Sequence, residues 1–233
     1  MGIPRALGGW LFDLIFPKFC AGCGREGAFC CSPCQTRLIF SAPACPVCSR
    51  RNFTGILCDP CAGETHLRRF LSPFSYRDLL VRELIHTYKY AGARELASLF
   101  AGELAAYLRA YGVRPSGSAV LIPIPLHPSR ERERGFNQAH LIAVALGERL
   151  GLPVADALRR VRANEPQVSL DSFEKRRANI AGVFRVADPA AVTGRTAILI
   201  DDVSTSGATL GEAAKTLRQA GCRTVWAMVI AKG

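Results

Sequence analysis

The stretch from Ala197 to Leu210 constrains this chain more than any other part of the sequence. Four apolar residues, Ala-Ile-Leu-Ile, lack helical spacing and are followed at once by Asp201 and Asp202. A short continuous apolar run of this kind is typical of a strand that is buried on both faces. In open α/β sheets, ligands bind at the carboxyl ends of such strands. The stretch therefore predicts a buried strand that ends abruptly in a polar site.

A helix is predicted directly after this strand, over residues 208–220, because apolar or small residues recur there at helical spacing and Gly221 follows. Its first unpaired N–H groups and the positive end of its dipole favour a bound anion. Carboxylates for ribose hydroxyls and amides for a phosphate would together suit a sugar phosphate. Each of these residues taken singly is more often a helix cap or a solvated turn residue. The ordered set favours a binding site, because two adjacent acids in a buried strand are costly without a ligand.

This order of elements resembles the signature of type I phosphoribosyltransferases, which binds 5-phosphoribosyl 1-diphosphate (PRPP). The resemblance implies that Asp201 and Asp202 are the catalytic acids and face the ribose 2- and 3-hydroxyls. It also implies Mg²⁺ bound together with PRPP. Ser206 stands where many members of that family carry threonine, and it keeps the hydroxyl. The residues that the resemblance places around the 5-phosphate are Ser204, Thr205, Ser206, Gly207, Ala208 and Thr209.

The N-terminal quarter of the chain is rich in cysteine. Nine of the ten cysteines precede residue 62, and eight of them form four Cys-x-x-Cys pairs. This spacing lets both thiolates of a pair face one ion, so it predicts two structural tetrahedral zinc sites. A disulfide framework is the competing interpretation, and the lack of a recognisable secretion signal disfavours it, which points to a reducing, cytoplasmic location. The predicted ligands are Cys20, Cys23, Cys31, Cys34, Cys45, Cys48, Cys58 and Cys61.

Spacing leaves two questions about these cysteines open. The four pairs could combine sequentially or in crossed fashion. Cys30 could be a spare buried thiol or could replace Cys31 as a ligand, and we favour Cys31. Closed all-thiolate sites have no open position for a substrate, so we expect this double zinc ribbon, residues 20–66, to bind nucleic acid or protein, or to stabilise the fold.

The formal net charge of +11 favours anionic partners such as nucleotides, nucleic acid or anionic lipid. The apolar segment from Trp10 to Phe16 is too short to cross a bilayer, and no transmembrane segment is expected. We predict a short apolar N-terminal helix within residues 1–19 that packs on the rest of the protein. A helix at the surface that binds a partner is the alternative.

The middle of the chain alternates helices and strands. Helices are predicted from Asp78 to Tyr90 and from beyond Gly92 to about Ala110, after a short strand over residues 70–76. A buried strand over 119–124 precedes a rigid proline turn and a loop rich in arginine. A helix ending at Leu150, a short strand over 183–186 and an apolar strand over 224–230 follow. This alternation predicts an α/β fold with a parallel sheet flanked by helices.

The segment from Pro123 to Gln138 reads Pro-Ile-Pro-Leu-His and then Arg-Gly-Phe-Asn-Gln. Together with Lys89-Tyr90 and the four cysteine pairs, this order resembles the ComF (GntX-like) family of competence proteins, over nearly the whole chain. That family joins a double zinc ribbon to a phosphoribosyltransferase domain, here residues 70–233 with a hood at about 70–115. The resemblance implies a pyrophosphate loop after the strand, with Leu126, His127, Arg130 and Arg134.

The same resemblance implies a mobile loop over about 158–179 that includes Gln167, Arg176 and Arg177. Its composition supports this independently, because arginines and Lys175 lie there among polar residues with little apolar periodicity. Such a loop could close over PRPP and exclude water. The competing interpretation of both basic segments is a solvated surface.

Three functions remain from the sequence: a phosphoribosyltransferase with an unidentified acceptor, a DNA-uptake factor that binds single-stranded DNA or other uptake proteins, and a PRPP sensor without turnover. In an enzyme, a nucleophile would displace pyrophosphate at ribose C1, with the two acids acting by position and charge. No residue stands out as a general base, and His127 fits a structural turn equally well. Phe173 is the one aromatic residue of the predicted mobile loop, which weakens the case for strand binding.

Overall fold

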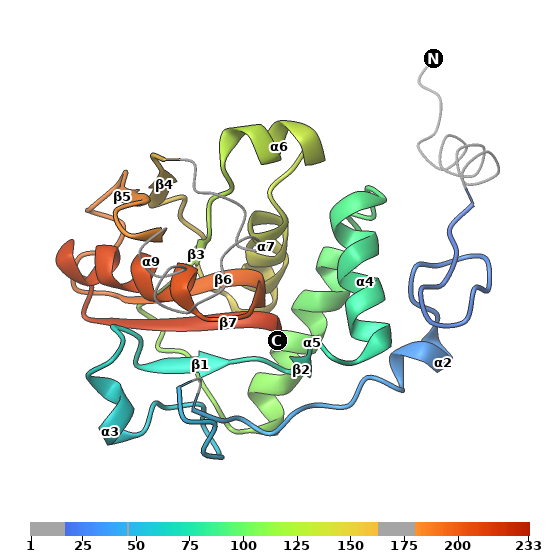
Figure 1. Ribbon diagram of the computed structural model, residues 1–233, viewed down its shortest axis with the longest axis horizontal. Helices are drawn as coiled ribbons and strands as arrows, with labels where there is room; N and C mark the ends of the chain where they lie inside the picture. Colours follow the sequence, from blue (N-terminus) through green and yellow to red (C-terminus); the bar gives the residue numbers. More distant parts are fainter. Residues whose placement is uncertain (1–16, 46, 163–179) are drawn as a thin grey trace.

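The computed structural model describes residues 17–45, 47–162 and 180–233 (Figure 1). Within these ranges a parallel sheet has the strand order β1-β7-β6-β3, and a short strand, β2, also pairs with β7. A separate antiparallel pair, β4 with β5, lies outside this sheet. The strands are β1 Arg69–Leu71, β2 Phe74–Ser75, β3 Ala119–Pro123, β4 Leu158–Arg160, β5 Phe184–Val186, β6 Thr196–Ser204 and β7 Thr224–Lys232.

The sheet is covered on both faces because its central strands are apolar on both sides. Along β6, Ile198 and Ile200 pack into one core with three helices, α4, α5 and α7. Their neighbours Ala197 and Leu199 point to the other core, which α9 and the β4–β5 pair complete. The helices of the described residues are α2 Ser32–Gln35, α3 Asp59–Ala62, α4 Leu79–Tyr90, α5 Leu96–Ala110, α6 Pro128–Arg134, α7 Gln138–Leu150 and α9 Ala208–Gln219. The predicted α/β class with a parallel sheet flanked by helices is therefore confirmed.

Local signals set the ends of the main helices. Asp78 precedes α4 and accepts a hydrogen bond from the Val81 amide (3.1 Å). Asn137 caps α7 by accepting from the amides of the next turn, and Gly151 ends this helix at φ 64°. These boundaries agree with the helices predicted from the sequence.

The structure corrects three local predictions. The strand expected over 70–76 is two short strands, β1 and β2, on either side of Pro73. The basic loop expected after β3 is the short helix α6, because Pro128 at its first turn favours helix and Gly135 ends it at φ 74°. The central strand does not end at the two acids: β6 stays paired with β7 up to Ser204, opposite Lys232.

The two cysteine-rich segments lie on opposite sides of the sheet edge (Figure 1). Cys20 and Cys34 pack into the core that contains α4 and α5, whereas Cys45 and Cys61 pack into the core that contains α9. Between them the chain crosses the edge of the sheet, where the Ser41 amide donates to the carbonyl of Pro73 (2.7 Å). The predicted double ribbon is thus two separate modules that both pack on the α/β domain.

Two predicted segments lie wholly or largely outside the described residues. The apolar N-terminal helix falls on residues 1–16, and most of the predicted mobile loop, with Gln167, Arg176 and Arg177, falls on residues 163–179. The first residues assigned to that loop, Leu158–Arg160, form strand β4. Across the parts of the chain that are described, no helix combines the length and apolar character that a bilayer crossing requires.

Candidate zinc centres and anion-binding pocket

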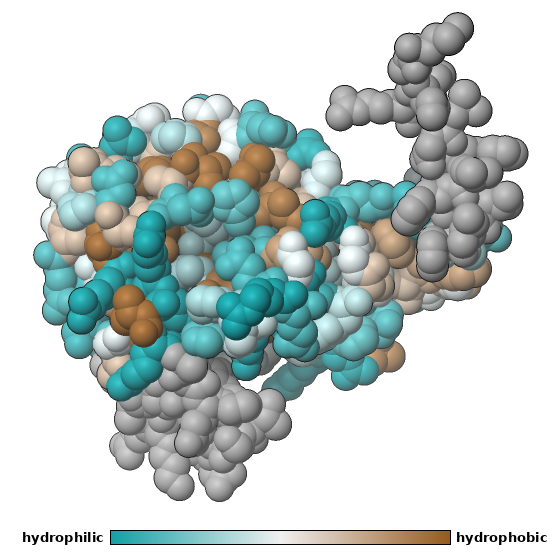
Figure 2. Space-filling model, turned by 90° about the horizontal axis from the view of Figure 1, so that it is seen from above, coloured by the Kyte–Doolittle hydropathy of each residue, from teal (hydrophilic) through white to brown (hydrophobic). Residues whose placement is uncertain are grey.

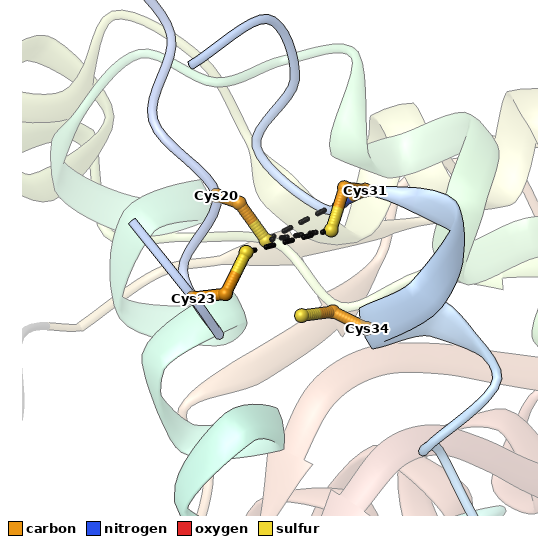
Figure 3. A group of neighbouring side chains, drawn as sticks. All are labelled: Cys20, Cys23, Cys31 and Cys34. Carbon is orange, nitrogen blue, oxygen red and sulfur yellow. Dashed lines mark hydrogen bonds between the residues drawn. The ribbon is translucent and has the colours of Figure 1, made fainter. Parts of the chain in front are cut away.

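Each cysteine-rich module brings four thiols together. Cys20 and Cys23 come from a loop, Cys31 immediately precedes α2, Cys34 lies within it, and their sulfurs point toward one another (Figure 3). The second group has the same design around α3. Among the described residues these are two groups, Cys20–Cys23–Cys31–Cys34 and Cys45–Cys48–Cys58–Cys61, with sulfurs within 4.8 Å of one another in each.

Their geometry is compatible with structural zinc. The Sγ–Sγ distances are 3.5 Å for Cys20–Cys31 and 3.6 Å for Cys23–Cys31 (Figure 3). Four sulfurs about 2.3 Å from a tetrahedral zinc ion are about 3.8 Å apart, so these thiols need little movement to bind one. The groups combine sequential pairs, which settles the open pairing. Cys31 belongs to the first group and Cys30 does not, which is the arrangement that the choice of Cys31 requires.

A repeated tetrapeptide in the sequence is a further signal for these centres. Cys31-Ser-Pro-Cys34 and Cys58-Asp-Pro-Cys61 are the same pattern, and in both the proline lies in the first turn of a four-residue helix. Each helix fixes the positions of two thiols of its group. One cysteine, Cys31 or Cys58, is the N-cap, and the other, Cys34 or Cys61, lies within the helix. The pattern therefore marks the pairs Cys31/Cys34 and Cys58/Cys61 as equivalent halves of two repeated modules.

The two acids of β6 line a cavity of about 260 Å³ at the carboxyl end of the sheet. Because side chains alternate along a strand, Asp202 faces α4, where its Oδ2 lies 3.1 Å from Lys89 Nζ. Asp201 faces the β4 side, and its Oδ1 accepts from the Asp202 amide (2.9 Å). Both nonetheless reach the same cavity, whose charged lining residues are Lys89, Arg130, Arg134, Arg160, Asp201 and Asp202.

The ionisation of Asp201 is strongly perturbed. Burial raises the pKa of this carboxyl from 3.8 to about 7, and the adjacent Asp202 raises it further, against the hydrogen bond from the Asp202 amide and the charges of Lys89 and Arg160. Burial and nearby Arg130 lower the pKa of Arg160. Asp201 lies beside Asp202, and Arg160 beside Arg130, so charges of the same sign repel each other in this cavity. Such repulsion lowers the stability of the unliganded fold, and residues with strongly shifted pKa values concentrate at functional sites.

The predicted phosphate-binding residues do not all line the acid cavity. Thr209, in the first turn of α9, lines the acid cavity. Ser204 is instead the buried last residue of β6, and its carbonyl accepts from the Gly233 amide (2.9 Å). Ser206, Gly207 and Ala208 line a neighbouring cavity of about 440 Å³ beside residues 64–67.

The turn before α9 contains a left-handed backbone conformation at Gly207. Gly207 is the N-cap of α9 and has φ 75°, a left-handed conformation that favours glycine. The Ser206 hydroxyl oxygen accepts from the Ala208 amide (3.4 Å). Exposed Thr205 lies at the tip of the turn. The amides of the first turn of α9 are thus presented beside the two acids.

The predicted pyrophosphate segment also divides. Leu126, Arg130 and Arg134 line the acid cavity, but His127 is not among its lining residues. His127 caps α6, its Nδ1 accepting from the Ser129 amide (3.3 Å), which is the structural role that the sequence left open. Arg134 Nη1 donates to Gln138 Oε1 (3.1 Å), and its guanidinium lies 5.3 Å from the centre of the Tyr90 ring.

Several residues of the cavity were not predicted as site residues. Lys89 and Gln138 belong to motifs that carried the family resemblance, and that was the one signal for them in the sequence. Asn137 donates from Nδ2 to the carbonyl of Ile124 (3.1 Å), which fastens the start of α7 to the end of β3. Arg160 reaches the cavity from β4.

The fold and the cavity define a class: an α/β domain with a parallel sheet and paired acids on a central strand, joined to two Cys₄ modules. No protein-family model matches the chain. It is 33% identical over 199 residues to competence protein ComFC of Bacillus subtilis, a match that covers 82% of this chain and 78% of that protein. It is 32% identical to DNA utilization protein YhgH of Shigella flexneri, over 78% of this chain and 86% of that protein.

The chain therefore belongs to the ComF family, which includes these two relatives. A solved structure of the allosteric regulatory enzyme of purine biosynthesis is 18% identical and superposes with a TM-score of 0.37, over 57% of this chain and 25% of that chain.

Proposed function

We propose that this protein binds PRPP with Mg²⁺ in the acid cavity and serves DNA uptake in natural transformation. The observation that carries the proposal is the cavity itself, in which Asp201 and Asp202 face Arg130, Arg134 and Lys89 at the carboxyl end of the sheet. Carboxylates accept from ribose hydroxyls, and guanidinium groups bind phosphate oxygens. The cavity thus offers acceptors and donors in the combination that a sugar diphosphate requires.

The donor set also fits magnesium. Carboxylate oxygens are ligands that Mg²⁺ prefers, and Asp201 and Asp202 supply them from adjacent positions of one strand. Bound together with PRPP, the ion would neutralise charge on the diphosphate. Lys89 holds Asp202 through the 3.1 Å ion pair and keeps that carboxylate oriented toward the cavity.

The start of α9 suits the 5-phosphate end of the ligand. Thr209 lines the cavity, and the amides that follow Gly207 lie at the positive end of the helix dipole. The first turn of α9 carries no acidic residue that would compete with an anion for these amides.

Calorimetry with PRPP and Mg²⁺ tests the proposal. We expect the wild-type chain to bind and the Asp201→Asn/Asp202→Asn variant to lose binding, because neither amide replaces a carboxylate toward Mg²⁺. Asp188→Asn is the matched control, since Asp188 is exposed and its amide oxygen can still accept from Ala191. Equal affinity in the wild type and the double variant would remove the sugar-phosphate assignment.

A role in handling DNA has its own support in the β4–β5 pair. Arg159 and Arg185 stand directly opposite each other there and are both exposed. Like charges opposed in this way are destabilising unless an anion lies near them. The face seen from above in Figure 2 is predominantly hydrophilic across its middle. The relatives named for competence and DNA utilization agree with such a role.

The salt dependence of single-stranded DNA binding tests this second part. A steep fall in affinity as salt rises is expected for a surface that displaces counterions, with a smaller slope in Arg159→Gln/Arg185→Gln. A flat response in the wild type would contradict DNA binding. Release of pyrophosphate from PRPP in the presence of candidate bases separates a transferase from a PRPP sensor, which are the alternatives for turnover.

A further inference from the structure

Gln138 has a buried side-chain amide whose nitrogen, Nε2, makes no hydrogen bond to the described residues. The residue is 1% exposed, and its Nε2 has no hydrogen-bond partner among the described residues. A buried donor left unpaired is costly, and native proteins seldom keep one without a ligand, a water or a functional reason. The same side chain lines the acid cavity. The unpaired amide therefore lies at the site rather than in the general core.

The orientation of this amide is fixed by its neighbours. Arg134 donates from Nη1 to Oε1 (3.1 Å), and because arginine can only donate, the atom it meets must be the oxygen. The Tyr88 hydroxyl donates to the backbone carbonyl of Gln138 (2.8 Å), which fixes the start of α7 against α4. The NH₂ end is then the end left for another partner.

We infer that Gln138 contacts the ligand directly, with Nε2 donating to a diphosphate oxygen. An amide NH₂ group can only donate, so the group it meets must be an acceptor. A ribose hydroxyl can accept as well as donate, but a charged diphosphate oxygen can only accept and forms the stronger hydrogen bond. Arg134, which holds the amide, is itself a suitable diphosphate donor that lines the same cavity. The inference rests on the proposed function and assigns one end of the ligand to α7.

Two substitutions separate direct contact from positioning of Arg134. Gln138→Met removes both the donor and the acceptor. Gln138→Glu keeps an oxygen for Arg134 and puts a carboxylate oxygen where Nε2 was, so it preserves positioning but repels an anion. Gln219→Glu is the matched control, because it makes the same charge change at an exposed position at the end of α9.

Calorimetry with Mg²⁺ and either inorganic pyrophosphate or ribose 5-phosphate provides the test. In Gln138→Met we expect the affinity for pyrophosphate to fall between about tenfold and about a hundredfold, as for a lost hydrogen bond to a charged group. Gln138→Glu should bind pyrophosphate more weakly still. The affinity for ribose 5-phosphate should stay within about threefold of the wild type, and Gln219→Glu should match the wild type with both ligands.

The inference is overturned if Gln138→Met keeps its affinity for pyrophosphate, or if Gln138→Glu binds pyrophosphate as well as the wild type. Equal loss of both ligands together with a lowered melting temperature would assign a structural role instead, and also overturns it. The two hypotheses can also fail separately. If the chain does not bind PRPP but binds pyrophosphate in a way that depends on Gln138, the proposed function fails and the inference is supported. A wild-type chain that binds neither probe would refute both.

Discussion

Replacing Asp201 by asparagine should stabilise the unliganded protein, and by more at high pH. Asp201 binds its proton more tightly in the folded chain, where its pKa is about 7, than in the unfolded chain, where it is near 3.8. The free energy of unfolding therefore falls as the pH rises through this window, and the full cost of the buried carboxylate is present above it. Asparagine keeps the oxygen that accepts from the Asp202 amide (2.9 Å) but carries no charge.

The size of the effect follows from the pKa difference. One pKa unit corresponds to about 1.4 kcal/mol, so the ionised carboxyl costs about 2 kcal/mol at about pH 5.5 and about 4 kcal/mol at about pH 8.5. We expect Asp201→Asn to exceed the wild type in free energy of unfolding by these amounts. The gain between the two pH values, about 2 kcal/mol, is the more robust quantity because pH-independent effects of the substitution cancel in it.

Urea unfolding of both proteins at the two pH values measures this difference. Asp188→Asn, an exposed change, should show no such pH-dependent gain. A difference between wild type and Asp201→Asn that does not grow with pH, or a variant that is less stable at about pH 8.5, would refute the argument from burial. With PRPP and Mg²⁺ present the order should reverse, because only the wild-type chain gains stability from the ligand.

Three further predictions concern other parts of the molecule. Cys31→Ser should lower the zinc content measured by atomic absorption from two ions per chain to one, whereas Cys30→Ser should keep two; the opposite result would reassign the ligand. Gly207→Ala and Gly194→Ala should each cost about 1–2 kcal/mol in thermal unfolding, since both glycines have a left-handed φ and open space around a Cβ, but only Gly207→Ala should weaken PRPP binding. Lys89→Met should lower the free energy of unfolding by about 1–3 kcal/mol because the carboxylate 3.1 Å from its Nζ loses its partner, and an unchanged value would show that the ion pair is not formed.

Local patterns in the sequence were sufficient for the main elements and for the four cysteine pairs. The apolar run before Asp201 is a buried strand because an unbroken apolar stretch must be covered on both faces. The Cys-x-x-Cys spacing shows which two thiols of each pair can face one ion, because both lie in one short loop, but the combination of the pairs into two groups came from the structure. The predictions that were wrong are the single strand over 70–76, the basic loop that is α6 and the end of β6. They concern boundaries that proline, short capping signals and strand pairing decide.

What the sequence by itself determined is therefore the α/β class, the four Cys-x-x-Cys pairs and the strand that carries the two acids, because each depends on residues close together in the chain. The tertiary structure decided the rest. It placed the two cysteine modules on opposite faces of the sheet, brought Lys89 to Asp202, and buried the amide of Gln138 beside them. These contacts join residues that are far apart in sequence, and they depend on how complete helices and strands pack, which a local pattern does not specify.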